Sequence, residues 1–113
     1  MERLFTYGSL QPGGPNEHVL DSVEGTWEPA FLRGRLVKAG WGEALGYPGL
    51  VIDESGDKVN GHLFSSSHLG DRWAYLDEFE GSEYQRTLSS VSLMNGAQVE
   101  AYVYLLRAGL GTT

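Results

Sequence analysis

Apolar residues are gathered along the chain in short runs, which glycine, proline and polar residues interrupt. Runs of this length, rich in β-branched and aromatic residues, predict strands rather than long helices. We expect strands at residues 3–7, 31–37, 50–52 and 59–64. Residues 39–49 hold four glycines and one proline, and residues 53–57 read DESGD, so both segments are expected to be loops or turns.

A helix is expected over residues 69–79, because apolar side chains recur there at the i, i+4, i+7 spacing of one helix face. These side chains are Leu69, Trp73 and Leu76. Gly81 is well placed to end this helix, and Ser66 or Ser67 is the expected cap at its start. A shorter helix, capped by Asn16, is expected to end near residue 22.

The strongest local signal is a hairpin formed by residues 84–94 and 98–106. Asn95-Gly96 lies between them, and this pair favours a type I′ turn, in which both central residues take φ > 0. Taken together, the elements predict an α+β domain whose short strands curl into a small mixed β-barrel with flanking helices. Residues 1–113 are expected to form a single domain, with residues 107–113 as a flexible tail.

Composition adds exclusions to this picture. The formal net charge is −7 with only 8 Lys and Arg residues, which disfavours nucleic acid and anionic membranes as partners. The absence of Cys excludes disulfides, thiolate nucleophiles and Cys-based metal sites. No apolar run approaches the ~18 residues of a membrane span, and the first residues lack a signal-peptide core, so a cytoplasmic protein is expected.

A loop rich in glycine and proline, YGSLQPGGP, follows the first predicted strand. Gly8 and Gly13 have the outer spacing of a phosphate-binding P-loop, but Gly14 and Pro15 occupy the positions of its Lys and Ser/Thr, which disfavours nucleotide binding. Two interpretations stay open. The segment is a tight turn, or its backbone N–H groups bind an anionic oxygen. The donors would be Gly8, Ser9 and Leu10.

The histidines and serines suggest no compact site. His18, His62 and His68 fall in three different predicted elements and lack H-x-x-x-H or H-x-H spacing, so no metal centre is predicted. Ser9 precedes a leucine, and the G-x-S-x-G elbow of serine hydrolases is absent. A Ser-His-Asp triad is therefore not expected.

The acidic segment at residues 76–86, LDEFEGSEYQR, is the best candidate site. Asp77, Glu78 and Glu80 lie at the end of the predicted helix, where the helix dipole and mutual repulsion disfavour ionised carboxylates. Solvated surface charge is the alternative interpretation. An inward-facing Glu80 would have a raised pKa suited to acid/base catalysis near neutral pH, with Arg86 as a partial counter-charge.

Two segments resemble the γ-glutamylcyclotransferase-like superfamily, and most closely its γ-glutamylamine cyclotransferase and AIG2-like branch. LFTYGSL at residues 4–10 is similar to the family's first strand and its Y-G-S/T-L motif. LDEFEG at residues 76–81, followed by Tyr84 and Arg86, is similar to its L-D-x-x-E-G motif with a downstream Y-x-R. Three further stretches resemble family sequences in the same order: YPGL (47–50), GHLF (61–64) and AYVY (101–104).

The resemblance implies a small β-barrel flanked by helices, with a ligand cavity at the YGSL loop and with no metal or organic cofactor. It implies that Glu80 is the catalytic general acid/base. The implied substrate-binding residues are Tyr7, Gly8, Ser9, Leu10, Pro48, Gly49, Tyr84 and Arg86. The implied reaction releases 5-oxoproline and a free amine from a γ-glutamyl amide. The substrate's own α-amine attacks, so no covalent enzyme intermediate forms. Gln11-Pro12 replaces a basic residue of many relatives, which leaves the identity of the substrate open.

Two other classes of function stay open. The first is a non-catalytic binding module that recognises γ-glutamyl or related small molecules on the same fold. The second is an interaction protein in which Trp27, Trp41 and Trp73 act as apolar anchors. We expect a γ-glutamyl small molecule as the binding partner, and a monomer or weak homodimer.

Overall fold

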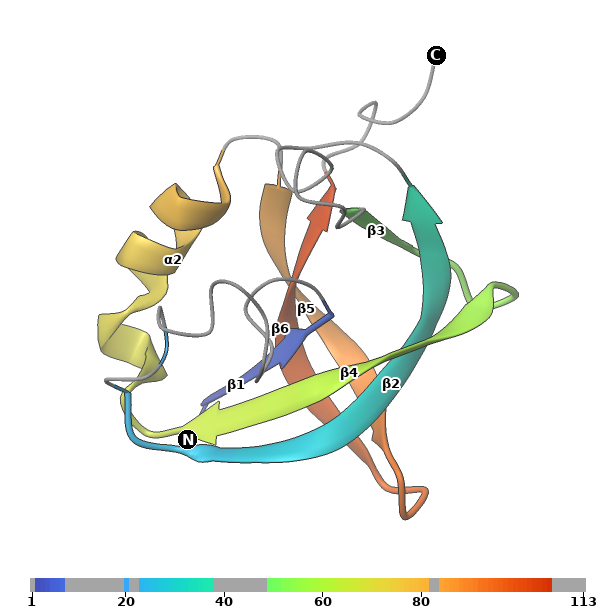
Figure 1. The fold of residues 1–113 in the computed structure, drawn as a ribbon, viewed down its shortest axis with the longest axis horizontal. Helices are drawn as coiled ribbons and strands as arrows, with labels where there is room; N and C mark the ends of the chain where they lie inside the picture. Colours follow the sequence, from blue (N-terminus) through green and yellow to red (C-terminus); the bar gives the residue numbers. More distant parts are fainter. Residues whose placement is uncertain (1, 8–19, 21–22, 38–48, 82–83, 107–113) are drawn as a thin grey trace.

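The computed structural model describes residues 2–7, 20, 23–37, 49–81 and 84–106 (Figure 1). These residues form six strands and two helical segments. The strands are β1 (Glu2–Thr6), β2 (Thr26–Val37), β3 (Gly49–Ile52), β4 (Asp57–Ser66), β5 (Tyr84–Leu93) and β6 (Gln98–Leu106). The helical segments are the 3-10 turn η2 (Leu69–Asp71) and the α-helix α2 (Trp73–Glu80).

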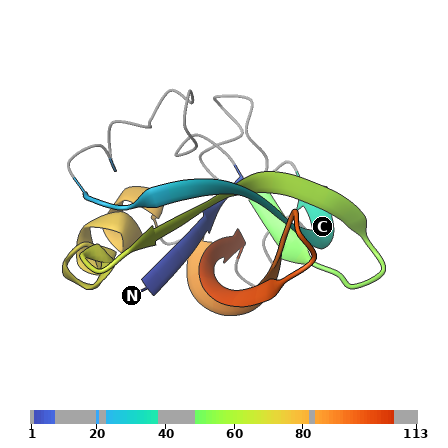
Figure 2. The same ribbon diagram turned by 90° about the horizontal axis from the view of Figure 1, so that it is seen from below.

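The strands close into a barrel with the order β3-β2-β4-β1-β6-β5, and an additional pairing of β2 with β5 completes the ring. The pairing of β1 with β6 is parallel, and the other pairings are antiparallel. Strand β3 extends β2 outside the ring. The two views show the strands curving around one interior, with α2 to one side (Figures 1 and 2). This confirms the predicted α+β fold with a small mixed barrel.

Two buried clusters fill the molecule, and side-chain alternation along β1 divides the strand between them. Leu4 joins the cluster beneath α2, whereas Phe5 points into the barrel. The helix-side cluster holds Leu4, Leu20, Val23, Phe64, Leu69, Trp73, Leu76, Tyr84 and Tyr104. The barrel-interior cluster holds Phe5, Ala30, Leu32, Leu50, Val59, Leu63, Val91, Ala101 and Val103.

Gly61 on β4 is required by close packing against β1. A Cβ at this position would overlap the carbonyl oxygen of Thr6 and the ring of Phe5. The glycine of the GHLF stretch therefore lets β4 approach β1 closely enough for Phe5 to lie in the barrel interior.

Strand β2 is longer than the sequence predicted, because it begins at Thr26 rather than at residue 31. The part that was not predicted includes Pro29. At Pro29 the described pairing is with β4 alone, and β5 joins the other side of β2 only at Ala30 and Phe31. A proline is tolerated where one side of a strand has no neighbour.

The predicted helix at residues 69–79 is divided in two. Its apolar face is confirmed, since Leu69 and Leu76 are fully buried and Trp73 is 8% exposed. However, η2 and α2 are separate segments with Arg72 between them. The predicted serine cap is also wrong for α2, which begins without a side-chain cap. Ser66 instead accepts a hydrogen bond from the His68 N–H (3.0 Å) before η2 begins.

The hairpin of β5 and β6 is confirmed, but its turn is not of type I′. Among the described residues only glycines take positive φ, so Asn95 does not, while Gly96 has φ 91°. The Gly96 N–H donates to the Leu93 carbonyl (3.0 Å), and the Leu93 N–H donates to the Ala97 carbonyl (2.8 Å). This is the pattern of a three-residue loop with glycine in the left-handed position. The Asn95 side chain accepts from the Ala97 N–H (2.9 Å), which holds the turn.

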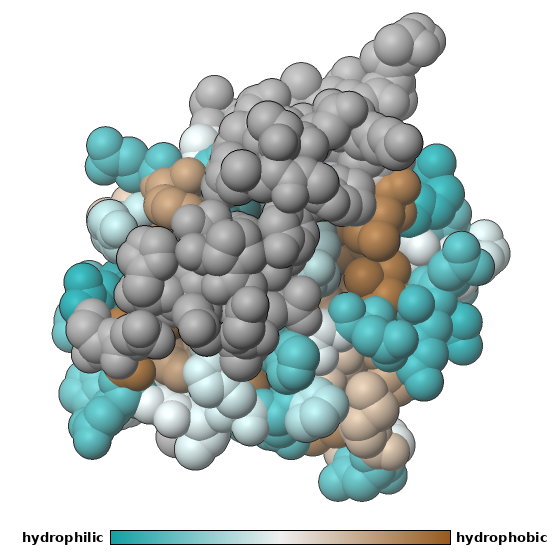
Figure 3. Space-filling view, viewed as in Figure 1, coloured by the Kyte–Doolittle hydropathy of each residue, from teal (hydrophilic) through white to brown (hydrophobic). Residues whose placement is uncertain are grey.

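Apolar side chains reach the surface at the β2–β3 end of the barrel (Figure 3). Leu36 and Ile52 are 50% and 38% exposed there. None of the described helices is long and apolar enough to span a membrane. Most of the predicted helix that begins at Asn16, most of the loop at 39–49 and the tail at 107–113 lie outside the described residues. Leu20, within the predicted helix, is described and is helical and buried.

Candidate functional site

Glu80 is the last residue of α2, and Gly81 ends the helix. Gly81 has φ 91°, a conformation that favours glycine, and its N–H donates to the Asp77 carbonyl (3.0 Å). The carbonyl of Gly81 accepts from the N–H of Tyr84 (3.2 Å), where β5 begins. The Glu-Gly pair therefore places Glu80 at the junction of α2 with β5.

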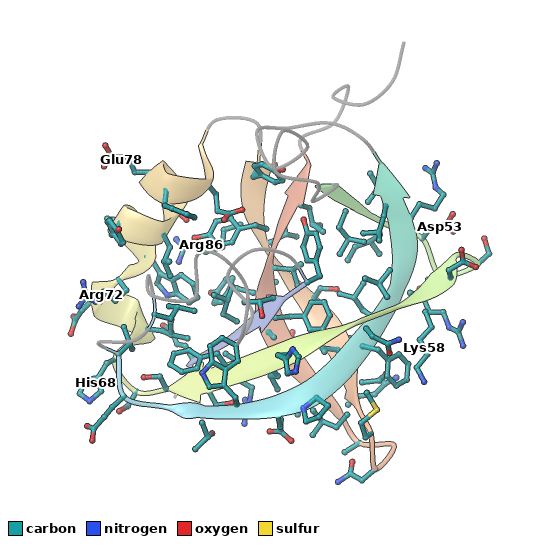
Figure 4. All side chains as sticks on the ribbon, in the orientation of Figure 1. Asp53, Lys58, His68, Arg72, Glu78 and Arg86 are labelled. Carbon is teal, nitrogen blue, oxygen red and sulfur yellow. The ribbon has the colours of Figure 1, made fainter. Side chains whose placement is uncertain are left out.

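Burial sets Glu80 apart from its acidic neighbours. Asp77 and Glu78 are exposed at the same helix end, whereas Glu80 is partly buried. Figure 4 shows Glu78 extending from the outer side of the helix. Burial raises the pKa of Glu80 from its ordinary value to about 7. The cause is loss of solvation, and not the mutual repulsion that the sequence suggested.

Two tyrosine hydroxyls lie within the electrostatic reach of Glu80. Burial is the main cause that raises the pKa of both Tyr7 and Tyr104, and the charge of Glu80 raises each further. The pKa of Tyr7 is also raised by Tyr84. Both hydroxyls therefore stay protonated near neutral pH. The Tyr7 hydroxyl donates to the backbone carbonyl of Tyr104 (2.7 Å), which ties the end of β1 to β6.

Arg86 is held by Asp77 rather than by Glu80. Its Nε lies 3.3 Å from the Oδ1 of Asp77, and the Tyr104 hydroxyl donates to the same oxygen (2.7 Å). The guanidinium carbon lies 4.4 Å from the ring centroid of Trp73 and 5.2 Å from that of Tyr102. The side chain thus fills the space between α2 and the β5–β6 ladder (Figure 4).

An open pocket of about 530 Å³ lies at this junction. Its lining includes Asp77, Glu78, Gly81, Tyr84, Gln85, Arg86 and Tyr104. The pocket combines apolar ring surface with one ion pair and a further carboxylate, and it adjoins the residue that follows Glu80. Its size suits a small polar ligand.

The structure brings several of the predicted site residues together. Glu80 and Tyr84 both act electrostatically on Tyr7, and Tyr84 and Arg86 line the pocket. Gly49 is buried at the start of β3. The other predicted positions, Gly8, Ser9, Leu10 and Pro48, lie outside the described residues.

Sequence reasoning missed the parts that Asp77 and Tyr104 play. Asp77 was expected to be one of several surface charges, and Tyr104 was noted only as part of the last strand. A signal was present, because Asp77 is four positions after Trp73 and three before Glu80, so the three residues share a helix face.

The two described tryptophans are packed in the protein interior. Trp73 is buried and Trp27 packs against the helix-side cluster, while Trp41 lies outside the described residues. The two described tryptophans are therefore core residues rather than exposed anchors. The described part of the chain contains no group of three or more His, Asp or Glu side chains that could hold a metal ion.

Comparison with known proteins gives one family. The profile of "gamma-glutamyl cyclotransferase, AIG2-like" proteins matches residues 4–112. A sequence comparison with curated proteins finds no match.

Several solved structures are similar to this chain in fold, and one of them is an AIG2-like protein. An AIG2-like protein from Mus musculus is 31% identical, with a TM-score of 0.65 over 93% of this chain and 76% of its own. An Arabidopsis thaliana protein is 28% identical, with a TM-score of 0.68 over 93% of this chain and 61% of its own. YkqA from Bacillus subtilis is similar in fold, with 24% identity and a TM-score of 0.70 over 96% of this chain. The chain spans only 37% of YkqA.

Proposed function

The chain belongs to the AIG2-like γ-glutamyl cyclotransferase family, and from this premise we propose that it converts a γ-glutamyl amide into 5-oxoproline and a free amine. The observation that carries the proposal is Glu80, a partly buried carboxylate beside a pocket, with its pKa raised to about 7. A carboxyl group of this kind exchanges protons readily at neutral pH.

The proposed reaction needs one proton carrier. Ionised Glu80 takes a proton from the substrate's α-ammonium group, and the resulting amine attacks the γ-carbonyl carbon of the same molecule. The ring C–N bond forms, and the C–N bond to the leaving amine breaks as protonated Glu80 returns its proton to the leaving nitrogen. The ring nitrogen then loses its second proton through the same carboxylate to the freed amine, which leaves as an ammonium ion and restores ionised Glu80. No water is consumed and no bond to the enzyme forms.

The chemistry suits a site without a nucleophilic serine or cysteine. Nucleophile and electrophile belong to one molecule, so the protein needs mainly to fix a near-attack conformation. We assign this task to the pocket beside Gly81, which Tyr84 and Arg86 help to line, and to Tyr7 and Gly49. We further assign the loop after β1, with Gly8, Ser9 and Leu10, and Pro48 to substrate binding. Each backbone N–H that meets the developing oxyanion is worth roughly 3 kcal/mol.

The test is detection of 5-oxoproline by mass spectrometry. The purified protein is incubated with a panel of γ-glutamyl amines and γ-glutamyl dipeptides, and Glu80→Gln is assayed in parallel. Gln keeps the shape of the side chain but carries no proton, so we expect the rate to fall by at least about 10²–10⁴-fold. Glu78→Gln is the matched comparison, since it removes an exposed carboxylate from the same helix end, and its rate should fall far less than that of Glu80→Gln. Glu100→Gln, at an exposed position on β6, is the control and should keep the wild-type rate.

Two results would count against the proposal. Wild-type rates from Glu80→Gln would remove Glu80 from the mechanism. Absence of 5-oxoproline from every member of the panel would remove the cyclotransferase reaction. In that case calorimetric binding of a γ-glutamyl compound without turnover would support a non-catalytic binding module instead.

A further inference from the structure

Asp77 is the point at which α2, β5 and β6 are joined by polar contacts. Its Oδ1 accepts the hydroxyl of Tyr104 on β6 (2.7 Å) and lies 3.3 Å from the Nε of Arg86 on β5. The Asp77 side chain is 46% exposed, whereas that of Arg86 is 27% exposed. A hydrogen-bonded ion pair with a shielded cation is stronger than an exposed surface pair.

Aromatic stacking prevents Arg86 from moving freely. Its guanidinium lies over Trp73 and also near the Tyr102 ring, and these two rings contact each other edge to face with centroids 5.0 Å apart. Trp73 lies one helical turn before Asp77, so α2 supplies both the stacking surface and the carboxylate. A planar guanidinium that is stacked and paired at once has one well-defined position.

Glu80 is the other carboxylate on this side of the helix, because it follows Asp77 by three positions. Glu80 acts electrostatically on the Tyr7 and Tyr104 hydroxyls, and the charged and titratable groups at these hydroxyls come from four elements. They are Asp77 on α2, Tyr7 after β1, Tyr84 and Arg86 on β5, and Tyr104 on β6. Both Glu80 and Arg86 influence the Tyr104 hydroxyl, so the guanidinium is near this site. Among these described groups Arg86 is the single cation.

Resting on the proposed function, we propose that Asp77 is a positioning residue for Glu80. By binding Arg86 and Tyr104, it withholds the guanidinium charge from Glu80 and fixes the last turn of α2 against β5 and β6. An arginine paired directly with Glu80 would favour the ionised carboxylate and weaken it as a proton acceptor.

The proposal predicts opposite effects for two substitutions. Asp77→Asn keeps the shape of the side chain but removes its charge, so Arg86 is free to act on Glu80, and the pKa of Glu80 should fall from about 7 by roughly 1. Arg86→Gln leaves the charge of Asp77 uncompensated beside Glu80, so the pKa should rise. The double variant Asp77→Asn/Arg86→Gln removes both charges and should return close to the wild-type value.

The measurement is a ¹³C NMR titration of the Glu80 side-chain carboxyl in the free protein. Glu78→Gln is the control, because its exposed carboxylate does not hold Arg86, and it should shift the pKa of Glu80 by less than Asp77→Asn. The amide spectrum of each variant reports its folding. Should Asp77→Asn fail to fold, Arg86→Gln still tests the proposal through the opposite sign.

The outcome is separable from that of the activity assay. An unchanged pKa of Glu80 in both single variants would overturn the role of Asp77, even in an active cyclotransferase. Shifts of the expected signs in a protein that forms no 5-oxoproline would overturn the proposed reaction and leave the electrostatic role of Asp77 intact. In an active enzyme, the acidic limb of the pH profile of kcat/KM should move with the NMR value.

Discussion

The barrel-interior cluster and the helix-side cluster differ in the types of side chain that they contain. The barrel interior consists of aliphatic side chains, alanines and Phe5. The helix-side cluster includes Trp73, Tyr84 and Tyr104, and it borders the charged groups at the end of α2. The barrel interior therefore contributes through burial of apolar surface alone. The seam between α2 and the barrel holds the groups able to do chemistry.

Most polar groups in this seam have partners. The hydroxyl of Tyr104 donates to Asp77, that of Tyr7 donates to a backbone carbonyl, and the Trp73 indole donates to Glu2. Glu80 differs, since burial disfavours its ionised form and raises its pKa to about 7. Removing a carboxylate from water costs free energy. We infer that the barrel interior raises the free energy of unfolding, whereas ionised Glu80 lowers it. The same burial gives Glu80 a pKa that suits proton transfer near neutral pH.

The largest expected effect is on the barrel side. Leu63→Ala truncates a fully buried residue of the barrel interior, and it should lower the free energy of unfolding by about 3–4 kcal/mol in urea denaturation. The activity per folded molecule should change little, because the pocket is lined by Tyr84 and Tyr104 of the helix-side cluster. Leu88→Ala, at a residue 50% exposed on β5, is the control and should cost less than about 0.5 kcal/mol. Equal losses in the two variants would contradict the comparison.

On the helix side, Glu80→Gln is expected to raise the free energy of unfolding, by less than Leu63→Ala lowers it. The pKa of Glu80 is about 7 in the folded protein and near 4.3, its reference value, in the unfolded chain. Between these values the folded state binds more protons, so wild-type stability falls as pH rises through this window. Glu80→Gln lacks this loss and should be more stable than the wild type by about 3 kcal/mol at pH 8.5.

The diagnostic feature is the pH dependence of that gain. Urea midpoints measured from pH 5 to pH 8.5 should show the advantage of Glu80→Gln shrinking as the pH is lowered. Glu78→Gln, in which an exposed carboxylate is replaced, should show a flat difference. A gain for Glu80→Gln that is independent of pH would mean that packing, and not ionisation, separates the two proteins.

The smallest expected effect comes from a matched pair of glycines. Gly81 and Gly96 both have φ 91°, and a Cβ at either would meet nothing within 4 Å. Gly96→Ala should therefore cost about 1 kcal/mol of strain in thermal or urea unfolding, and Gly81→Ala somewhat more, because its ψ of 176° lies in a region that is essentially restricted to glycine. Only Gly81→Ala should lower kcat/KM, by up to about 10²-fold, because it displaces the neighbouring Glu80. Equal kinetic losses in the two variants would show that the seam is not the place of catalysis.

Local patterns predicted much of the fold. The hairpin of β5 and β6 followed from Asn95-Gly96, and the buried face of α2 followed from the spacing of its apolar residues. The type of the turn did not follow, because the side-chain bond from Asn95 to Ala97 and the positive φ of Gly96 alone decide it. The start of β2 was also missed, since tolerance of Pro29 depends on which neighbouring strands are present.

The candidate site was predictable in part. Glu80 stood out through its position before the glycine that ends the helix. The partner of Arg86 was not predictable, because Trp73, Tyr102 and Asp77 build its position from two elements that meet only in the folded protein. The raised pKa of Glu80 has the same origin, as burial depends on packing between distant segments.

The parallel pair of β1 and β6 bears on how quickly this barrel can assemble. Leu4 pairs with Tyr102 and Phe5 with Val103, so the contact joins the first and last strands of the described chain. Bringing these two strands together closes a long loop, which costs conformational entropy. The contacts between them offset this cost only after most of the intervening chain has been ordered, so we expect the pairing to form late in folding. Refolding should therefore take milliseconds to seconds, the range typical of β-rich domains. The pairing of β1 with β6 should be among the last steps before the native structure is complete.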